Sequence, residues 1–409
     1  RRFKSRSTRC TGLAAGGAIA APGAQLVTAD LHGQRWRSLG SGEDSDTVWR
    51  RLGRLNWLLV LVLLSIGAFG IASLYSAADG NWRPWALQQA VRFGMGLCFL
   101  LAIALIDLRV WRLAAYPVYA VALFLLIAVE FVGVGDGAQR WIDLGFMNLQ
   151  PSEVMKLALI MALARYFHDL DENQINRPIA LIVPLLISVA PVLLILRQPD
   201  LGTATILVSL AVVGLFLGGL AWWKFVLAGA VGGMVAPLAW GMLHEYQRER
   251  VLTFLEPERD PLGAGYHIVQ SKIALGSGGA FGKGFMEGSQ AQLSFLPEKH
   301  TDFIFTLMAE EFGFFGSLIL LLLYVVVMYL GYKVSSFAQS VFARVLVICL
   351  LFNFFLYAFI NMAMVMGLMP VVGVPLPLVS YGGTAMLTLM IGFGLIQSVA
   401  VHGHQPLHR

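Results

Sequence analysis

Long apolar stretches separated by short polar connections dominate the chain from residue 56 to residue 401. A helix that spans a bilayer needs roughly 20 mostly apolar residues. Ten stretches approach or reach that length, at residues 56–76, 87–106, 112–132, 153–168, 178–196, 201–222, 225–243, 314–332, 344–366 and 378–401. The pattern therefore predicts an all-α polytopic membrane protein, with ten transmembrane helices in a membrane domain at residues 49–402.

Basic residues are distributed unevenly among the connections between these helices. Connections that hold Arg109 and Arg112, or Lys333 and Arg344, alternate with connections that hold one basic residue or none. The positive-inside rule places the basic connections in the cytoplasm. Both termini are then expected in the cytoplasm, and the long loop at 244–302, between helices seven and eight, is expected on the extracytoplasmic side.

The two ends of the chain differ from the membrane domain. Residues 1–48 have a basic beginning and an Ala/Gly-rich middle that lacks the leucine-rich core of a signal peptide. We expect a disordered tail there, either native or the product of a misassigned start site, and a short cytoplasmic tail at 403–409. The run from Asp302 to Ala309 is too short to cross a bilayer and is expected at its interface.

Composition agrees with a membrane protein and argues against several other classes. Hydrophobic residues make up 57% of the chain and charged residues 13%, and the mean hydropathy is +0.72. The net charge of +5 comes mostly from basic residues that flank apolar segments, so nucleic acid is not expected as a partner. The three cysteines lie far apart, which favours neither a disulfide framework nor a metal site.

Two clusters of charged residues lie at helix ends on the predicted outer side, where ionisable groups suggest a functional site. The first contains Arg140, Glu153 and Lys156. A structural Glu153/Lys156 pair at i, i+3 is as well supported as a functional role. The second places Arg197 and Asp200 at a short turn, where a structural pair is favoured by about two to one.

Two further clusters lie in or beside the long loop. The glycine-rich run at 276–284 has no Walker A motif, but its amides would suit an anion nest next to Lys283, and a merely flexible loop fits equally well. In the stretch FLPEKHTDFIF, Glu298, His300 and Asp302 crowd against an apolar run. Asp302 fits a helix N-cap as well as a general base at the bilayer interface.

Several loop motifs occur in an order that is typical of one family. They are GAQRWIDLG, QPSE, QPDLGT, DPLGAGYHIVQSKIALGSGG, FLPEKHTDFIF, AEEFG and GLMPVVGVPLPLVSYGG, and the match covers about residues 50–402. In these motifs the chain resembles the SEDS (shape, elongation, division and sporulation) proteins. Val372 and Pro375 favour the elongation branch of the family over the division branch, which typically carries Thr-Lys and LTLP in this motif.

The resemblance implies a peptidoglycan glycosyltransferase that polymerises lipid II on the outer face of the cytoplasmic membrane. Asp302 matches the residue thought to be essential in the family, and Arg140, Lys156 and Asp200 match residues of its cavity. The resemblance also implies a class B penicillin-binding protein as a partner for transpeptidation, with other membrane proteins of the elongation complex.

The expected reaction needs a base and cations but no nucleotide. Asp302 would accept the proton of the acceptor's 4-hydroxyl group as that oxygen attacks C1 of the donor. Arg140, Lys156, Lys283 or a divalent cation, Mg or Mn, would stabilise charge on the departing diphosphate.

Three more residues are candidates for the same site. Glu298 and His300 would tune Asp302 or bind a metal, although a lone histidine is more often a hydrogen-bonded surface residue. Ser380 follows three prolines in the run at 370–377 and is expected beside the substrate groove. A plain helix start with proline in its first turn explains that motif equally well.

Two other functions would use a similar architecture. A lipid II flippase or other lipid transporter would distribute charges along a path between the two leaflets, whereas the strong motifs here gather on the predicted outer side. A scaffold of the elongation machinery would leave Asp302 replaceable. The one-sided distribution of the motifs favours the enzyme.

Overall fold

The computed structural model describes residues 48–134, 139–143, 145, 148–171, 177–242, 245–256, 264–288, 300–404 and 407. The chain divides into two units, Arg1–Thr47 and Val48–Arg409, and all of the described residues belong to the second. Residues 1–47 of the predicted tail and most of the predicted tail at 403–409 therefore lie outside the described part.

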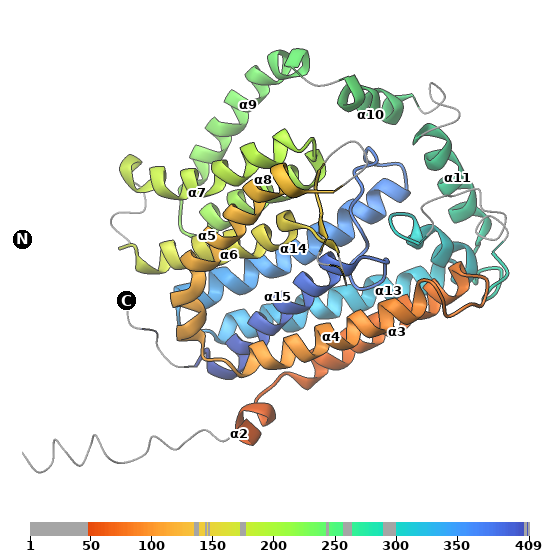
Figure 1. Ribbon diagram of the computed structural model, residues 1–409, viewed down its shortest axis with the longest axis horizontal. Coiled ribbons are helices and arrows are strands. Elements are labelled where there is room, and N and C mark those ends of the chain that lie inside the picture. The colour runs from red at the N-terminus through yellow and green to blue at the C-terminus, as the bar shows by residue number, and fades with distance from the viewer. Residues whose placement is uncertain are drawn as a thin grey trace, which may run out of the picture. The chain divides into compact units, whose positions relative to one another are not determined.

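Helices account for nearly all of the described secondary structure, and one small antiparallel hairpin accompanies them (Figure 1). In chain order the elements are α2 (Val48–Gly53), α3 (Trp57–Ala77), α4 (Ala86–Leu105), α5 (Leu108–Val132), β1 (Ile142–Asp143), β2 (Asn148–Leu149), α6 (Pro151–Asp169), α7 (Pro178–Arg197), α8 (Leu201–Leu217), α9 (Trp222–Met242), α10 (Glu245–Leu255), α11 (Ala264–Ser277), α13 (Ile304–Phe337), α14 (Val341–Val365) and α15 (Gly383–His402). In the hairpin, Ile142 pairs with Leu149 and Asp143 with Asn148.

Seven helices in the described part of the chain are long and apolar enough to cross a membrane, namely α3, α4, α5, α7, α13, α14 and α15. The apolar stretches of α8 and α9 are shorter, and α6 carries Glu153 and Lys156 in its first two turns. Each of the ten predicted segments overlaps a helix. The helical, multi-pass prediction is confirmed, while the number of ten spanning helices and the side of the long loop stay predictions.

Short polar side chains and prolines fix where several helices begin. Asn56 Oδ1 accepts a hydrogen bond from the Leu59 amide at 3.2 Å, and Ser340 Oγ accepts one from the Ala343 amide at 3.2 Å. Both side chains satisfy an amide that the first helical turn leaves without a partner. Proline is the first residue of α6 and of α7, where its missing N–H costs nothing.

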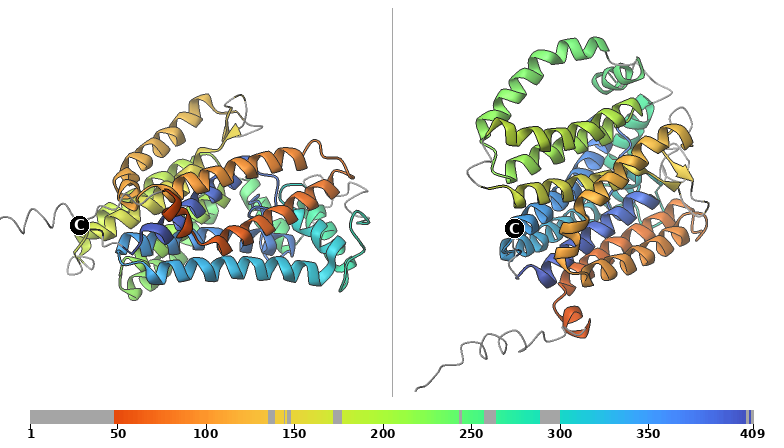
Figure 2. Two further views of the ribbon diagram at one scale, coloured as in Figure 1. Left: turned by 90° about the horizontal axis from the view of Figure 1, so that it is seen from below. Right: turned by 60° about the vertical axis from the view of Figure 1, so that its left-hand side comes forward.

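The centre of the bundle is formed by α14 and α15, and α15 lies between α4, α13 and α14 (Figure 1). Most side chains of α14 and α15 are buried. The outer helices α5, α7 and α9 instead expose large apolar side chains, such as Phe124 and Leu186, as expected for surfaces that face lipid. Helix α9 leans away from the other helices (Figure 2).

The apolar run after Asp302 and the predicted spanning segment at 314–332 are both helical and meet at Gly313. Both fall within α13, but the backbone of Gly313 (φ 66°, ψ −160°) is not helical, so two helices adjoin at a kink there. Essentially only glycine adopts this backbone conformation. A Cβ atom at this position would also stand 2.2 Å from the backbone nitrogen of Gly282.

The kink receives the glycine-rich run, and we call residues 278–284 the glycine clasp. The amides of Lys283 and Gly284 donate hydrogen bonds to the carbonyls of Glu310 and Glu311 at 3.0 and 3.1 Å. In return the Phe314 amide donates to a carbonyl of the clasp at 3.0 Å. These two clasp amides bind carbonyls of α13 and do not face an anion. At these two positions the glycine-rich run therefore braces α13 and does not form an anion nest.

Candidate functional site

A polar cavity of about 280 Å³ lies where the first turns of α6, α8 and α15 meet. The hairpin region, the turn between α7 and α8, the turn before α13, the middle of α14 and the loop before α15 complete its wall. Its charged and phenolic lining includes Arg140, Glu153, Lys156, Asp200, Asp302 and Tyr357. The fold thus brings four of the sequence-predicted site residues, Arg140, Lys156, Asp200 and Asp302, to one cavity.

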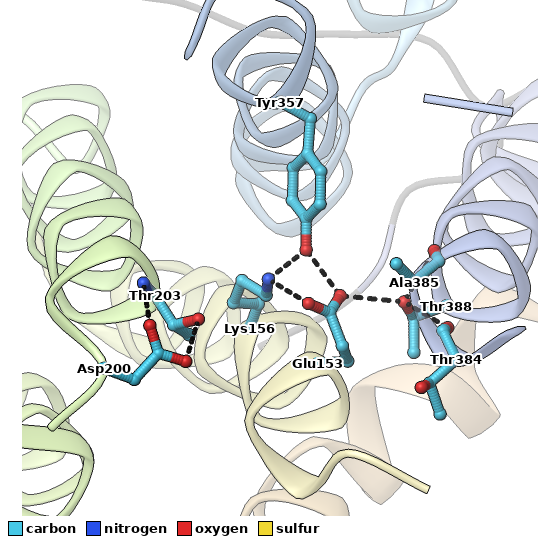
Figure 3. Close-up of polar contacts among 8 residues, drawn as sticks. All are labelled: Glu153, Lys156, Asp200, Thr203, Tyr357, Thr384, Ala385 and Thr388. Atoms are coloured by element: carbon cyan, nitrogen blue, oxygen red, sulfur yellow. Dashed lines mark hydrogen bonds and ion pairs between the residues drawn. The ribbon is translucent and has the colours of Figure 1, made fainter. Parts of the chain in front are cut away.

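A buried network borders this cavity and joins three helices (Figure 3). Lys156 Nζ donates a hydrogen bond to Glu153 Oε1 at 2.7 Å and a second one to the hydroxyl of Tyr357. That hydroxyl donates to Glu153 Oε2 at 2.5 Å. Thr388 of α15 donates to the same carboxylate oxygen at 3.3 Å. The network therefore ties α6 to α14 and to α15.

Pairing is what makes these charges tolerable in the bundle. The side chains of Glu153 and Lys156 are only 6% and 2% exposed, and an isolated buried charge would destabilise the fold strongly. The i, i+3 spacing on α6 brings the two groups together, and Tyr357 satisfies both of them. The structural pair considered in the sequence analysis is present, and it also lines the cavity.

Arg140 fixes the hairpin region against the turn between α7 and α8. Its Nε donates to the carbonyl of Gln198 and its Nη2 to the carbonyl of Pro199, each at 2.8 Å. These bonds use two of the five N–H donors of a guanidinium group. The half-buried side chain lines the cavity, so its remaining donors are available for a ligand there.

Asp200 is the N-cap of α8. Its Oδ1 accepts a hydrogen bond from the Thr203 amide at 3.0 Å, and its Oδ2 accepts one from the Thr203 hydroxyl at 2.9 Å (Figure 3). Both oxygens therefore have a partner within the first turn of the helix. The predicted structural role is present, although with Thr203 and not with Arg197 as its partner, and Asp200 also lines the cavity.

Asp302 lies in the turn before α13 and is held by the amide of Asn361. Asn361 Nδ2 donates to the carbonyl oxygen of Asp302 at 2.8 Å and to that of Val374 at 2.7 Å. The N-cap of α13 is Phe303, without a side-chain capping bond. The alternative that Asp302 is simply the helix cap is therefore wrong. Its carboxylate is close to the loop, because a Cβ atom on Gly373 would stand 3.4 Å from Asp302 Oδ2.

His300 and Ser380 do not line the cavity. The His300 ring stacks on Trp85, with centroids 4.4 Å apart and planes 9° apart. Ser380 is buried, and its Oγ accepts a hydrogen bond from the Leu376 amide at 2.7 Å. Ser380 thus shapes the loop before α15, while His300 packs beside it, since the His300 carbonyl accepts a bond from the Tyr381 amide at 2.9 Å.

Lys283 is also absent from the cavity wall. Its Nζ lies 2.7 Å from Glu310 Oε1, an ion pair that reinforces the glycine clasp. Glu298 lies outside the described residues. Among the residues that are described, no group of three or more His, Cys, Asp or Glu side chains is arranged to hold a metal ion.

Sequence reasoning missed Tyr357 and Asn361, which both lie in α14. Their local sequence, FFLYAFINMAM, is apolar and carries no loop motif. The available signal was weaker, because polar side chains inside spanning helices need partners in the bundle. Asn361, which is fully buried near the end of α14, was the clearest such residue.

The described part of the chain thus holds seven apolar helices and a polar cavity, which define a multi-pass helical membrane protein with a candidate catalytic site. A family model described as "Cell cycle protein", and named for FtsW, RodA and SpoVE, matches residues 53–405, so the chain belongs to this family. The SEDS resemblance seen in the motifs is confirmed.

Individual relatives agree with this assignment. "Peptidoglycan glycosyltransferase MrdB" of Escherichia coli K12 is 43% identical over 360 residues, which are 87% of this chain and 96% of the relative. A structure described as "Structural coordination of polymerization and crosslinking by a peptidoglycan synthase complex" contains a chain with 33% identity and a TM-score of 0.75, covering 86% of this chain and 99% of that one. The rod shape determining protein RodA of Thermus thermophilus has 28% identity and a TM-score of 0.66, over 86% of this chain and 98% of RodA. The likeness to the elongation branch is confirmed.

Proposed function

We propose that the protein is a peptidoglycan glycosyltransferase of cell elongation, which polymerises lipid II into β-1,4 glycan strands with Asp302 as general base. MrdB, which is 43% identical, is named a peptidoglycan glycosyltransferase. The observation that carries the site assignment is the shared cavity. Asp302, Arg140 and Asp200 come from separate loops and turns, yet they line one space with the buried Lys156.

The cavity is assigned to the extracytoplasmic face and both termini to the cytoplasm. The first turns of α6 and α15 line the cavity. The basic connections with Arg109, Arg112, Lys333 and Arg344 join helix ends on the other side of the bundle. The positive-inside rule supports this orientation, and a lipid-linked sugar would then reach the cavity from the outer leaflet.

In the proposed step, a carboxylate oxygen of Asp302 takes the proton from the acceptor's 4-hydroxyl group. The acceptor oxygen bonds to C1 of the donor sugar, and the bond from C1 to the diphosphate oxygen breaks, with its electron pair leaving on the diphosphate. One displacement inverts the anomeric centre, from an α-linked donor to a β-linked strand. A retaining route needs a second carboxylate about 5 to 5.5 Å away as nucleophile.

The other carboxylates of the described cavity wall are poor candidates for that nucleophile. Glu153 is ion-paired and buried, and both oxygens of Asp200 accept hydrogen bonds from Thr203. Each Asp200 oxygen keeps a lone pair that could bind a cation, but a nucleophile must also be free to move onto the carbon, and the two bonds from Thr203 hold this carboxylate at the start of α8. The arrangement therefore favours direct displacement with Asp302 as the base.

Charge on the leaving diphosphate needs donors on the cavity wall. Arg140 has N–H groups beyond the two that hold the α7–α8 turn, so it is assigned to the diphosphate. The ammonium of Lys156 donates hydrogen bonds to Glu153 and Tyr357. It therefore contributes indirectly, by holding that network in position at the cavity wall. Mg²⁺ is usually bound by one or two carboxylates plus substrate phosphates, and Asp200 is the carboxylate that would hold it and help neutralise the diphosphate.

A class B penicillin-binding protein is the proposed partner, with other membrane proteins of the elongation complex. One solved structure is described as a peptidoglycan synthase complex that coordinates polymerization and crosslinking. It contains a chain that resembles 86% of the present chain. On this proposal, the present chain makes glycan strands and its partner crosslinks them.

The test is polymerisation of lipid II by purified protein, together with the partner transpeptidase, in liposomes. The variant Asp302→Asn keeps the shape of the side chain and removes the base. Loss of general base catalysis lowers the rate by about 10² to 10⁴. Glu287→Gln is the matched control, because Glu287 is an exposed carboxylate outside the cavity wall. Thermal unfolding of each variant checks that the fold is retained.

The proposal requires glycan strands from the wild type and from Glu287→Gln, and almost none from Asp302→Asn. Equal rates in all three proteins would place the base elsewhere. If no protein makes strands but the wild type moves lipid II between leaflets, transport replaces polymerisation as the function. If neither activity is found, a scaffolding role remains.

A further inference from the structure

A second cavity, of about 210 Å³, lies at the far end of the bundle from the polar cavity. The end of α15 lines it, whereas the start of α15 lines the polar cavity. A helix of 20 residues is about 30 Å long, which is the thickness of the hydrocarbon core. The two cavities therefore open near opposite faces of the membrane, and the reaction proposed above uses no residue of the second.

The walls of this second cavity are fixed by hydrogen bonds between helices. Buried Gln397 of α15 accepts a bond from the Asn56 amide at 3.0 Å through Oε1 and donates one to the Asn56 carbonyl at 2.9 Å through Nε2. The Gln339 amide, just after α13, donates to the Gly403 carbonyl at 3.1 Å. The start of α3 is thus joined to α15, and the end of α13 is joined to the end of α15. The cavity between these three helices is therefore preformed.

The lining combines an apolar wall with two basic side chains at the rim. Phe337 and Val399 contribute to the wall, and Lys333 and His404 supply the basic groups. Within the described part of the chain, the side chains of Lys333 and His404 make no hydrogen bond or ion pair. The ammonium of Lys333 lies 4.8 Å from the centroid of the Tyr329 ring. A ligand that fits this site has an anionic head and an apolar body.

The surface around the cavity has the composition of a membrane–water interface. Trp57, Tyr332 and Phe337 are exposed at this end, and large aromatic side chains concentrate at the level of lipid headgroups. Arg51, whose guanidinium donates to the Leu105 carbonyl at 3.0 Å, belongs to a basic segment beside them. The positive-inside rule assigns this end to the cytoplasmic leaflet, where anionic lipids give the surface a negative potential.

We propose that this cavity binds one anionic glycerophospholipid of the cytoplasmic leaflet. Lys333 and His404 bind the phosphate, and an acyl chain lies along Phe337 and Val399. Basic pockets between transmembrane helices on the cytoplasmic side are known to hold such headgroups. The site is independent of glycosyl transfer, so binding is the quantity to measure.

The experiment uses the full chain in nanodiscs of phosphatidylcholine that contain a photoreactive phosphatidylglycerol. Crosslinked peptides are mapped by mass spectrometry, and labelling is expected in residues 333–338 and 399–404. Each basic residue near an anionic surface contributes about a fivefold change in binding, so Lys333→Gln with His404→Gln is expected to reduce labelling at least fivefold. Ala400→Phe keeps both basic groups but fills the cavity, and it is expected to reduce labelling as well.

Arg344→Gln is the matched control, because Arg344 is an exposed basic residue that follows α13 but does not line the cavity. It must leave labelling close to that of the wild type, because Arg344 does not contact the proposed headgroup. Equal labelling by photoreactive phosphatidylcholine would overturn the proposal. Full labelling of Ala400→Phe would also overturn it, because the basic side chains would then bind the lipid without the cavity. Better competition by a polyprenyl phosphate than by phosphatidylglycerol would assign the cavity to a different lipid and would also overturn it.

Discussion

The hydroxyl of Tyr357 donates a hydrogen bond of 2.5 Å to Oε2 of Glu153, and so links the middle of α14 to the first turn of α6. Lys156 completes a triangle, because its ammonium donates to both of these residues. All three side chains are buried at the cavity wall. The Tyr357 hydroxyl is therefore the group that allows a carboxylate and an ammonium to lie together while buried from water.

Removing this hydroxyl is expected to weaken both the fold and the enzyme. In Tyr357→Phe, Glu153 and Lys156 each lose a partner while staying buried, which destabilises the protein by about 1 to 3 kcal/mol. Polymerisation is expected to fall at least tenfold, since the network borders the cavity. Thermal unfolding in detergent and lipid II polymerisation measure the two effects.

Tyr119→Phe is the control for that substitution. Tyr119 donates to the Ile187 carbonyl at 2.9 Å, away from the cavity, so the control loses a comparable bond. It is expected to lower the melting temperature but to keep the rate of polymerisation. A Tyr357→Phe protein with full activity would show that the hydroxyl only stabilises the bundle.

The charged pair can be tested by removing one charge or both. Lys156→Met leaves Glu153 buried without its cation, and breaking a buried pair in this way costs about 3 to 5 kcal/mol. Adding Glu153→Gln removes the orphaned charge, so the double variant is expected to be more stable than Lys156→Met alone. Unfolding curves of the wild type, Lys156→Met, Glu153→Gln and the double variant give the coupling energy.

Activity separates two roles for this pair. If the pair is needed for the reaction, the double variant regains stability but stays at least tenfold slower than the wild type. A double variant that polymerises lipid II at the wild-type rate would make the pair a purely structural brace. If the double variant is no more stable than Lys156→Met alone, the result would contradict an ion pair between Glu153 and Lys156.

Much of the architecture was predictable because lipid restricts the choices. Buried backbone in a membrane must be satisfied within helices, so runs of apolar residues translate directly into α3, α5 and α14. The loop motifs likewise pointed to Asp302, Arg140 and Asp200. These residues stand out against an apolar background, which is why the sequence exposes them.

The parts that were missed depend on contacts between distant segments. The link between Tyr357 and Glu153 is invisible along the chain, because an apolar helix gives no sign of which neighbour it faces. The glycine-rich run was equally ambiguous, as its amides could have held an anion. The packing of Gly282 against the kink at Gly313, together with the backbone hydrogen bonds between the two segments, shows that the run closes on α13.

The kink of α13 supplies a third prediction. In Gly313→Ala, the new methyl group would meet the backbone of Gly282 and would require a conformation that suits only glycine. We expect a loss of at least about 2 kcal/mol of stability, because the glycine clasp must open. Gly232→Ala is the control, since a Cβ atom there meets nothing within 4 Å. A Gly313→Ala protein as stable as Gly232→Ala would contradict the clasp.

Asn361 offers the sharpest test of how Asp302 is positioned. Its amide holds the carbonyls of Asp302 and Val374 at 2.8 and 2.7 Å, and both of these residues line the cavity. Asn361→Leu keeps a branched side chain of similar shape but releases both segments. A shift of about 1 Å in a catalytic group lowers a rate about a hundredfold. We therefore expect kcat for lipid II to fall by that factor while KM changes little.

Asn353 provides a control on the same helix. It is also buried, and its side-chain oxygen, like that of Asn361, has no hydrogen-bond partner, but its amide nitrogen does not hold the turn of Asp302. Asn353→Leu should therefore leave activity unchanged and stability equal or higher, since it removes an unsatisfied polar group. If Asn361→Leu lowers stability but leaves kcat intact, the turn that carries Asp302 holds its position without the amide. If instead KM rises and kcat is kept, the loop around Val374 binds substrate and does not position the base.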